Sequence, residues 1–177
     1  YLDGNKNIEI SSCNFNNNNL YFAGGLNVNE SVRILDNINI YEVYLNGDVD
    51  GLRLESNTIH GSSNYYAAIS IQGSYSYNNC LIKGNTIASS YSYAIRVYLP
   101  TDSIRIVSNT ITYTGSSQAI YFQNTNTSSV ANVIKDNDIS TSGYQYIHAQ
   151  NVDSIVGNKM TGALNNTGVE LVSGATL

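Results

Sequence analysis

One stretch of this chain reads Ser103-Ile104-Arg105-Ile106-Val107-Ser108-Asn109-Thr110-Ile111, an alternation of apolar and polar residues that ends on Asn-Thr-Ile. Versions of it recur along the chain, and their Asn, replaced by Cys in the first version, stands at positions 13, 37, 57, 85, 109, 137 and 158. Neighbouring versions are thus 20 to 28 residues apart. Repeats of this length are typical of solenoids, in which a unit cannot bury its apolar face alone and stacks on the next.

A second short strand follows the Asn turn in each repeat. These segments share an apolar–polar–apolar order and are Leu20–Phe22, Val43–Leu45, Ile69–Ile71, Ile95–Val97, Ile120–Phe122, Ile147–Ala149 and Val169–Leu171. Successive side chains of a strand point to opposite faces, so we expect the outer two residues in the core and the middle one outside. A leucine-rich repeat has a similar length, but the sequence lacks its Leu-x-x-Leu-x-Leu pattern and its helical segment.

Stacked coils about 4.8 Å apart align equivalent residues into ladders. One predicted aliphatic ladder is Ile10, Ile34, Leu54, Ile82, Ile106, Ile134 and Ile155. The sequence therefore predicts an all-β fold, a right-handed parallel β-helix or solenoid of about seven coils, in a single domain over residues 1–177. Neither end carries an amphipathic helix to cover the terminal coil, so we expect an excerpt of a larger chain, with coil ends capped by flanking domains or in a homotrimer.

The repeated Asn predicts a structural ladder of its own, made of Asn37, Asn57, Asn85, Asn109, Asn137 and Asn158. Asn tolerates a left-handed backbone, and its amide can hydrogen-bond to the coils above and below. A small residue, Ser, Asp or Gly, precedes it each time. The same register places Cys13 and Cys80 about three coils, or roughly 14 Å, apart, which exceeds the Cα separation of about 7 Å that a disulfide allows, so both thiols are predicted to be free.

Composition excludes several classes of partner. Only 12% of the residues are charged, the formal net charge is -5, and no basic run is available to meet phosphates. A nucleic-acid or anionic-membrane partner is therefore not expected. No apolar run approaches the roughly 20 residues of a membrane span, so membrane insertion is not expected either. The sequence indicates no cofactor and no metal site.

The Asn-x-Ile coil repeat, seen in Asn57-Thr58-Ile59 and Asn109-Thr110-Ile111, resembles that of the pectin-lyase-like superfamily of right-handed parallel β-helices. The resemblance covers nearly the whole chain. Members of that superfamily include pectate lyases, polygalacturonases, uronate epimerases, phage tail spikes and surface adhesins. The resemblance implies a protein that handles poly- or oligosaccharide and is extracellular, on a cell surface or on a virion.

The outward residues of the second strands predict two neighbouring columns on one sheet. The first column is Tyr21, Tyr44, Ser70, Arg96, Tyr121, His148 and Glu170, and the second is Ala23, Asn46, Gln72, Tyr98, Gln123, Gln150 and Val172. Sugar C–H faces pack on aromatic rings, and sugar hydroxyls bond to planar amide and guanidinium groups. The candidate carbohydrate-binding residues are therefore Tyr44, Gln72, Arg96, Tyr98, Tyr121, Gln123, His148 and Gln150. The alternative is an ordinary solvated sheet, because Tyr and Gln also suit a β surface.

Excursions rich in Tyr, Ser and Gly are expected to follow the Asn-x-Ile motif, at His60–Ala67, Ala88–Tyr93, Thr112–Gln118 and Ser140–Gln145. They are expected either to wall a groove beside the two columns or to shield the core. Their tyrosines are Tyr65, Tyr66, Tyr91, Tyr93, Tyr113 and Tyr144.

No catalytic residue is assigned. Glycoside hydrolysis uses two carboxylates about 5–9.5 Å apart, whereas Glu42 and Glu170 are expected on or near the face but at opposite ends of it. The motifs of polygalacturonases and epimerases are absent, and no acid cluster falls beside Arg96. The sequence favours non-catalytic carbohydrate recognition, as in a tail spike or an adhesin. The alternatives are a polysaccharide lyase or glycoside hydrolase with acids partly outside this segment, and a structural stalk.

Overall fold

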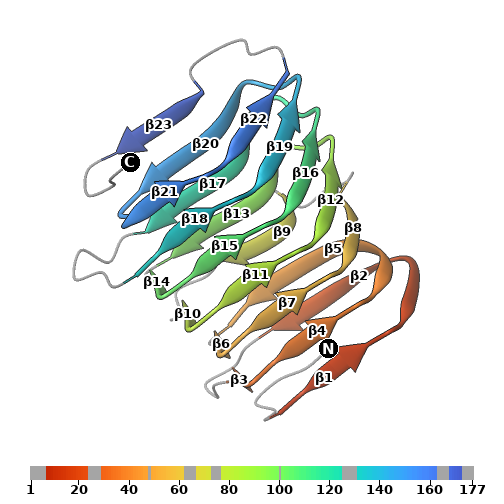
Figure 1. The fold of residues 1–177 in the computed structure, drawn as a ribbon. Helices are drawn as coiled ribbons and strands as arrows, with labels where there is room; N and C mark the ends of the chain where they lie inside the picture. Colours follow the sequence, from red (N-terminus) through yellow and green to blue (C-terminus); the bar gives the residue numbers. More distant parts are fainter. Residues whose placement is uncertain are drawn as a thin grey trace.

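A computed structural model of the chain describes residues 7–23, 29–47, 49–61, 67–72, 77–99, 101–124, 131–162 and 168–172 (Figure 1). These residues form strands and turns only, so the predicted all-β fold is confirmed. Within them there is no helix with the length and apolarity needed to cross a membrane.

One sheet runs along the whole stack and takes a three-residue strand from each repeat. Its strands pair in parallel and in order β1, β4, β7, β11, β15, β18, β21. The central residues of these strands are in register from Ile10 to Ile155, which is the predicted aliphatic ladder. The strands are β1 (Glu9–Ser11), β4 (Arg33–Leu35), β7 (Arg53–Glu55), β11 (Leu81–Lys83), β15 (Arg105–Val107), β18 (Val133–Lys135) and β21 (Ser154–Val156).

A larger sheet follows the Asn turn and has two halves that are joined through the long strand β5 (Ile38–Asn46). The long strand β2 (Asn14–Ala23) pairs with β5. One half, called here the β8–β22 half-sheet, contains β8 (Thr58–Gly61), β12 (Thr86–Ser89), β16 (Thr110–Tyr113), β19 (Asp138–Thr141) and β22 (Lys159–Thr161). The other, the β9–β23 half-sheet, contains β9 (Ala67–Gln72), β13 (Tyr93–Leu99), β17 (Gln118–Asn124), β20 (Gln145–Gln150) and β23 (Val169–Val172).

A third, smaller sheet is formed by two-residue strands that lie, in sequence, just before the first strand of the next coil. It contains β3 (Asn29–Glu30), β6 (Val49–Asp50), β10 (Tyr77–Asn78) and β14 (Thr101–Asp102). The coils stack so that β1 and β23 lie near opposite ends of the molecule (Figure 1). The stack amounts to about five turns, slightly fewer than the seven coils predicted.

Asn side chains tie each coil to its neighbours on both sides. Nδ2 of Asn109 donates to the Ile82 carbonyl on the preceding coil (3.0 Å) and to Oδ1 of Asn137 on the following coil (2.9 Å). Its Oδ1 accepts from the backbone N and from Nδ2 of Asn85, both at 3.0 Å. The same bonds repeat along the stack, and the five Asn residues from Asn37 to Asn137 are at most 1% exposed.

The left-handed backbone at this turn belongs to the small residue before each Asn, and not to the Asn as the sequence argument assumed. Their φ angles lie between +53° and +66°. These residues are Ser12, Asp36, Ser56, Gly84, Ser108, Asp136 and Gly157. The division of roles is physical, since the small residue makes the turn and leaves the Asn side chain pointing into the stack.

The loops expected after the Asn-x-Ile motif begin later than predicted, because the strand that follows the Asn turn continues into the residues that were expected to form them. His60–Gly61, Ala88–Ser89, Thr112–Tyr113 and Ser140–Thr141 lie in the β8–β22 half-sheet. Tyr113, expected in a loop, is fully buried, and its hydroxyl donates to the Ser92 carbonyl (2.6 Å) and accepts from the Ser117 backbone N (2.7 Å). A Cβ on Gly115 or Gly143 would lie 2.6 Å from atoms of this phenol side chain, so both positions need glycine. Tyr65 and Tyr66 lie outside the described residues.

Both cysteines are free, as predicted. Cys13 is exposed at the first position of the Asn column, where its backbone N donates to Oδ1 of Asn37 (2.9 Å). Cys80 is buried, and burial raises the pKa of its thiol to about 12. The predicted ion pair between Arg33 and Glu9 is present at 3.0 Å and exposed, so it contributes little to stability.

Replacement of Asn109 by Ala is predicted to lower the free energy of unfolding by about 3 kcal/mol, because the buried Ile82 carbonyl and Asn85 amide lose partners. Urea unfolding followed by circular dichroism measures the effect. Asn158→Ala is the matched control, with a smaller expected loss, since Asn158 is partly exposed and water can replace its bonds. Equal unfolding midpoints for Asn109→Ala and the wild type would contradict this account of the column.

Candidate functional site

The two predicted outward columns lie side by side on the β9–β23 half-sheet and on the adjoining end of β5. In the first, Tyr44, Ser70, Arg96, Tyr121, His148 and Glu170 are paired coil to coil. In the second, Gln72, Tyr98, Gln123 and Gln150 are paired in the same way. The structure therefore brings all eight candidate binding residues onto one surface, called here the Tyr–Arg–Gln face.

Arg96 is the centre of the face. Its Nη1 donates to Oε1 of Gln72, and the Nε2 of Gln72 donates in turn to the Tyr44 hydroxyl, so one amide links three coils. The Arg96 guanidinium lies 4.9 Å from the ring centroid of Tyr98 and 5.8 Å from that of Tyr93. Contacts of this kind between a cation and aromatic rings hold the planar guanidinium in place.

Tyr121 continues the face toward the C-terminal coils. Its ring stacks on His148 (centroids 4.8 Å apart, 12° between planes) and is tilted against Tyr93 (5.0 Å, 41°). Its hydroxyl donates to Oε1 of Gln123. Burial raises the pKa of the Tyr121 phenol, and the neighbouring Tyr93 adds to the rise.

A hydrogen-bonded group of polar side chains closes the C-terminal end of the face. Nδ1 of His148 lies 2.9 Å from Oε2 of Glu170, and Nε2 of Gln145 donates to the same oxygen (3.2 Å). Oε1 of Gln145 accepts from Nε2 of Gln118 (2.7 Å). The bond from His148, followed by the bond from Gln145, lowers the pKa of the Glu170 carboxyl.

Exposure differs sharply among the candidate residues. Tyr98 is the most open, with 44% of its surface exposed, whereas Tyr121 and Arg96 are partly buried by their neighbours. Ser70 points outward by register but is buried between Tyr44 and Arg96. Glu42, expected on or near the face, is instead buried within β5, so it is not a surface carboxylate.

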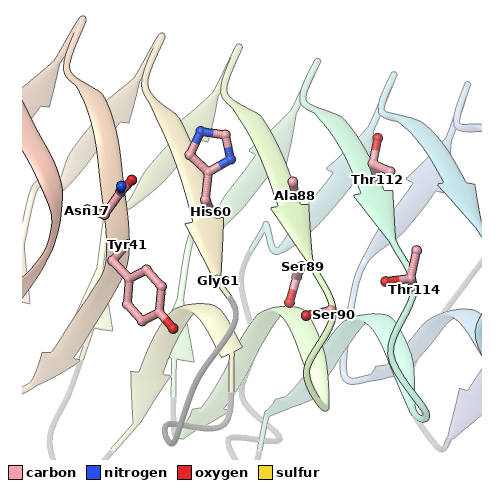
Figure 2. A pocket seen from close by; sticks show the side chains of 9 residues that line it. All are labelled: Asn17, Tyr41, His60, Gly61, Ala88, Ser89, Ser90, Thr112 and Thr114. Carbon is pink, nitrogen blue, oxygen red and sulfur yellow. The ribbon is translucent and has the colours of Figure 1, made fainter.

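A second feature lies on the β8–β22 half-sheet and was missed by the sequence argument. It is a groove of about 470 Å³ whose lining includes Tyr41 of β5, His60 of β8, Ala88 of β12 and Thr112 of β16 (Figure 2). His60, Ala88 and Thr112 are paired coil to coil in one outward column. The sequence did contain a signal for these strands, because polar and apolar residues alternate directly after the Asn turn. These residues were expected in loops.

The described part of the chain contains no group of three or more His, Cys, Asp or Glu side chains placed to hold a metal ion. Comparison with protein-family models, with curated proteins and with solved structures gives no match.

The pairing of His148 with Glu170 predicts a measurable pKa effect. Because the carboxyl pKa is lowered in the folded state, the pair stabilises the fold above the ordinary Glu range and loses this contribution as pH falls through the folded pKa. Replacement of His148 by Ala is expected to raise the pKa of Glu170, as measured by NMR titration of its side-chain carboxyl carbon. His60→Ala is the control, since His60 is distant in register and should leave the titration unchanged. An unshifted Glu170 pKa in His148→Ala would show that the pair does not form in solution.

Proposed function

We propose that this β-solenoid recognises carbohydrate through the Tyr–Arg–Gln face. One observation carries the proposal: the exposed Tyr98 ring packs beside the Arg96 guanidinium, which is itself held by the Gln72 amide. An aromatic ring next to a fixed planar donor matches the two needs of a sugar, an apolar surface for its C–H face and directed bonds for its hydroxyls.

The arrangement of the face along the stack supports this choice. Tyr98, Tyr121 and His148 come from three successive coils, and coils repeat at about 4.8 Å, close to the length of one sugar ring. A saccharide chain lying along the stack axis therefore meets a ring from each of these coils, with Tyr98 in one column and Tyr121 and His148 in the neighbouring one. Gln123 and Gln150 supply amides beside the rings.

The side chains of the Tyr–Arg–Gln face favour binding of the carbohydrate without its cleavage. Of the described residues in the two columns, Glu170 alone carries a carboxylate, and it is engaged by His148 and Gln145. Hydrolysis of a glycoside uses a pair of carboxylates. The same proposal assigns the chain to the pectin-lyase-like superfamily, in an extracellular, cell-surface or virion protein such as a tail spike or an adhesin.

The Tyr98→Ala, Tyr121→Ala double variant tests the proposal. We expect glycan binding to weaken by about tenfold or more, the size typical of losing aromatic contacts at the centre of a site. A glycan array first identifies the ligand, and calorimetry then measures its affinity. Tyr121→Ala alone is also expected to lower stability modestly, because the ring packs on His148 and Tyr93.

Tyr144→Ala is the matched control, because its side chain is similarly exposed (42%) but makes no ring contact among the described residues. Binding should be unchanged in this variant. If every glycan that binds the array keeps its affinity in the double variant, or if the array binds no glycan, the Tyr–Arg–Gln face is not a carbohydrate site.

A further inference from the structure

Small residues, with Ala88 at the centre of the outward column, line the groove on the β8–β22 half-sheet. In the outward column of this half-sheet, His60, Ala88, Thr112, Ser140 and Thr161 follow one another coil by coil. Ala88 is the member with the smallest side chain, and it lies between His60 and Thr112 (Figure 2). The resulting hollow, about 470 Å³, falls within the range of about 300–1,000 Å³ that is common for small-molecule sites.

The walls of the groove combine aromatic surface with hydrogen-bonding groups. Tyr41 and His60 offer rings on one side, and the hydroxyls of Thr112 and Thr114 stand on the other (Figure 2). His60 and Thr112 are exposed, and in the described part of the chain their side chains make no hydrogen bond. Ser89 also lines the groove, but its hydroxyl is already engaged with the Tyr93 carbonyl (2.9 Å).

The chemistry of the lining defines the class of ligand. None of the described residues that line the groove is Asp, Glu, Lys or Arg. A charged sugar would lose hydration there without gaining a counter-ion, which costs free energy. A neutral polyhydroxyl chain loses less hydration free energy on entering the groove. The hydroxyl and imidazole groups of the lining can replace its bonds to water, because they both donate and accept hydrogen bonds.

We propose that this groove is a second saccharide-binding site, specific for a neutral oligosaccharide that lies across the coils of Tyr41, His60, Ala88 and Thr112. It is on the other half-sheet from the Tyr–Arg–Gln face and shares no residue with it. The two sites therefore differ in character, since the described lining of the groove holds no Asp, Glu, Lys or Arg and the face has a guanidinium at its centre.

The test fills the groove and leaves the other face intact. Ala88→Tyr places a ring in the hollow at an outward strand position, and Thr161→Tyr, in the same column but two coils beyond Thr112, is the matched control. Calorimetry uses four probes: cellotetraose, maltotetraose, the tetramer of N-acetylglucosamine and tetragalacturonate. We expect a neutral tetraose to bind the wild type, Thr161→Tyr, and the Tyr98→Ala, Tyr121→Ala variant with similar affinity, and to bind Ala88→Tyr at least about tenfold more weakly.

The proposal is wrong if Ala88→Tyr weakens the binding of none of the neutral probes. It is also wrong if the Tyr98→Ala, Tyr121→Ala variant no longer binds any neutral probe, or if the groove binds tetragalacturonate more tightly than the neutral probes. If Ala88→Tyr does not fold, the Tyr41→Ala, His60→Ala double variant decides by the same criteria. A loss confined to the Tyr98→Ala, Tyr121→Ala variant concerns the Tyr–Arg–Gln face, and a loss confined to Ala88→Tyr concerns the groove, so the two proposals fail separately.

Discussion

The buried Asn column is the constraint on which the rest of the structure depends. From Asn37 to Asn137, each Asn bonds to a backbone carbonyl of the coil before it and to the Asn of the coil after it, so a coil cannot rotate or slip without breaking both contacts. Such bonds count for more in the interior than at the surface, because an unpaired buried amide retains its full desolvation cost. The turn that presents the Asn is made by a small residue in the left-handed region, for example Gly84 or Ser108.

Fixing the rotation of every coil fixes what lies on the outside. Equivalent outward residues then stand one strand spacing apart, which is the distance at which flat side chains stack. The ring centroids of Tyr21 and Tyr44 lie 4.8 Å apart, and the two ring planes differ by 5°. Tyr121 and His148 are stacked in the same way nearer the C-terminal end of the stack. Side-chain amides exploit the same spacing, as Gln72 does between Tyr44 and Arg96. The Tyr–Arg–Gln face is therefore a product of the register, with its rings and amides held by one another before any ligand arrives.

The repeat and its alternation predicted the parallel sheets, the ladder from Ile10 to Ile155 and the outward columns, because these follow from spacing alone. Contacts between side chains did not follow from it. Alternation predicts that the Tyr121 side chain points outward. It does not predict that Tyr93 and His148 cover part of the Tyr121 ring. Tyr113 looks like a loop tyrosine in sequence, and its burial depends on two glycines on neighbouring turns that make room for the ring.

The groove escaped prediction for a related reason. Small residues such as Gly61 and Ala88 leave it open, so the site is defined by side chains that are small and not by a motif. A Ser- and Tyr-rich segment such as Ala88–Tyr93 resembles a loop, and the length of β12 is decided by pairing with β8 and β16, which composition does not reveal.

The central claim is that the Asn-registered coils present a surface that binds saccharide. NMR of the Tyr ring resonances, recorded during titration with the best ligand from a glycan array, tests it most directly because the rings themselves report. The account predicts saturable shifts centred on Tyr98 and Tyr121, with little change at Tyr113, which is sealed in the core. Tyrosine rings that do not respond to any bound glycan, or a response centred on Tyr113, would contradict it.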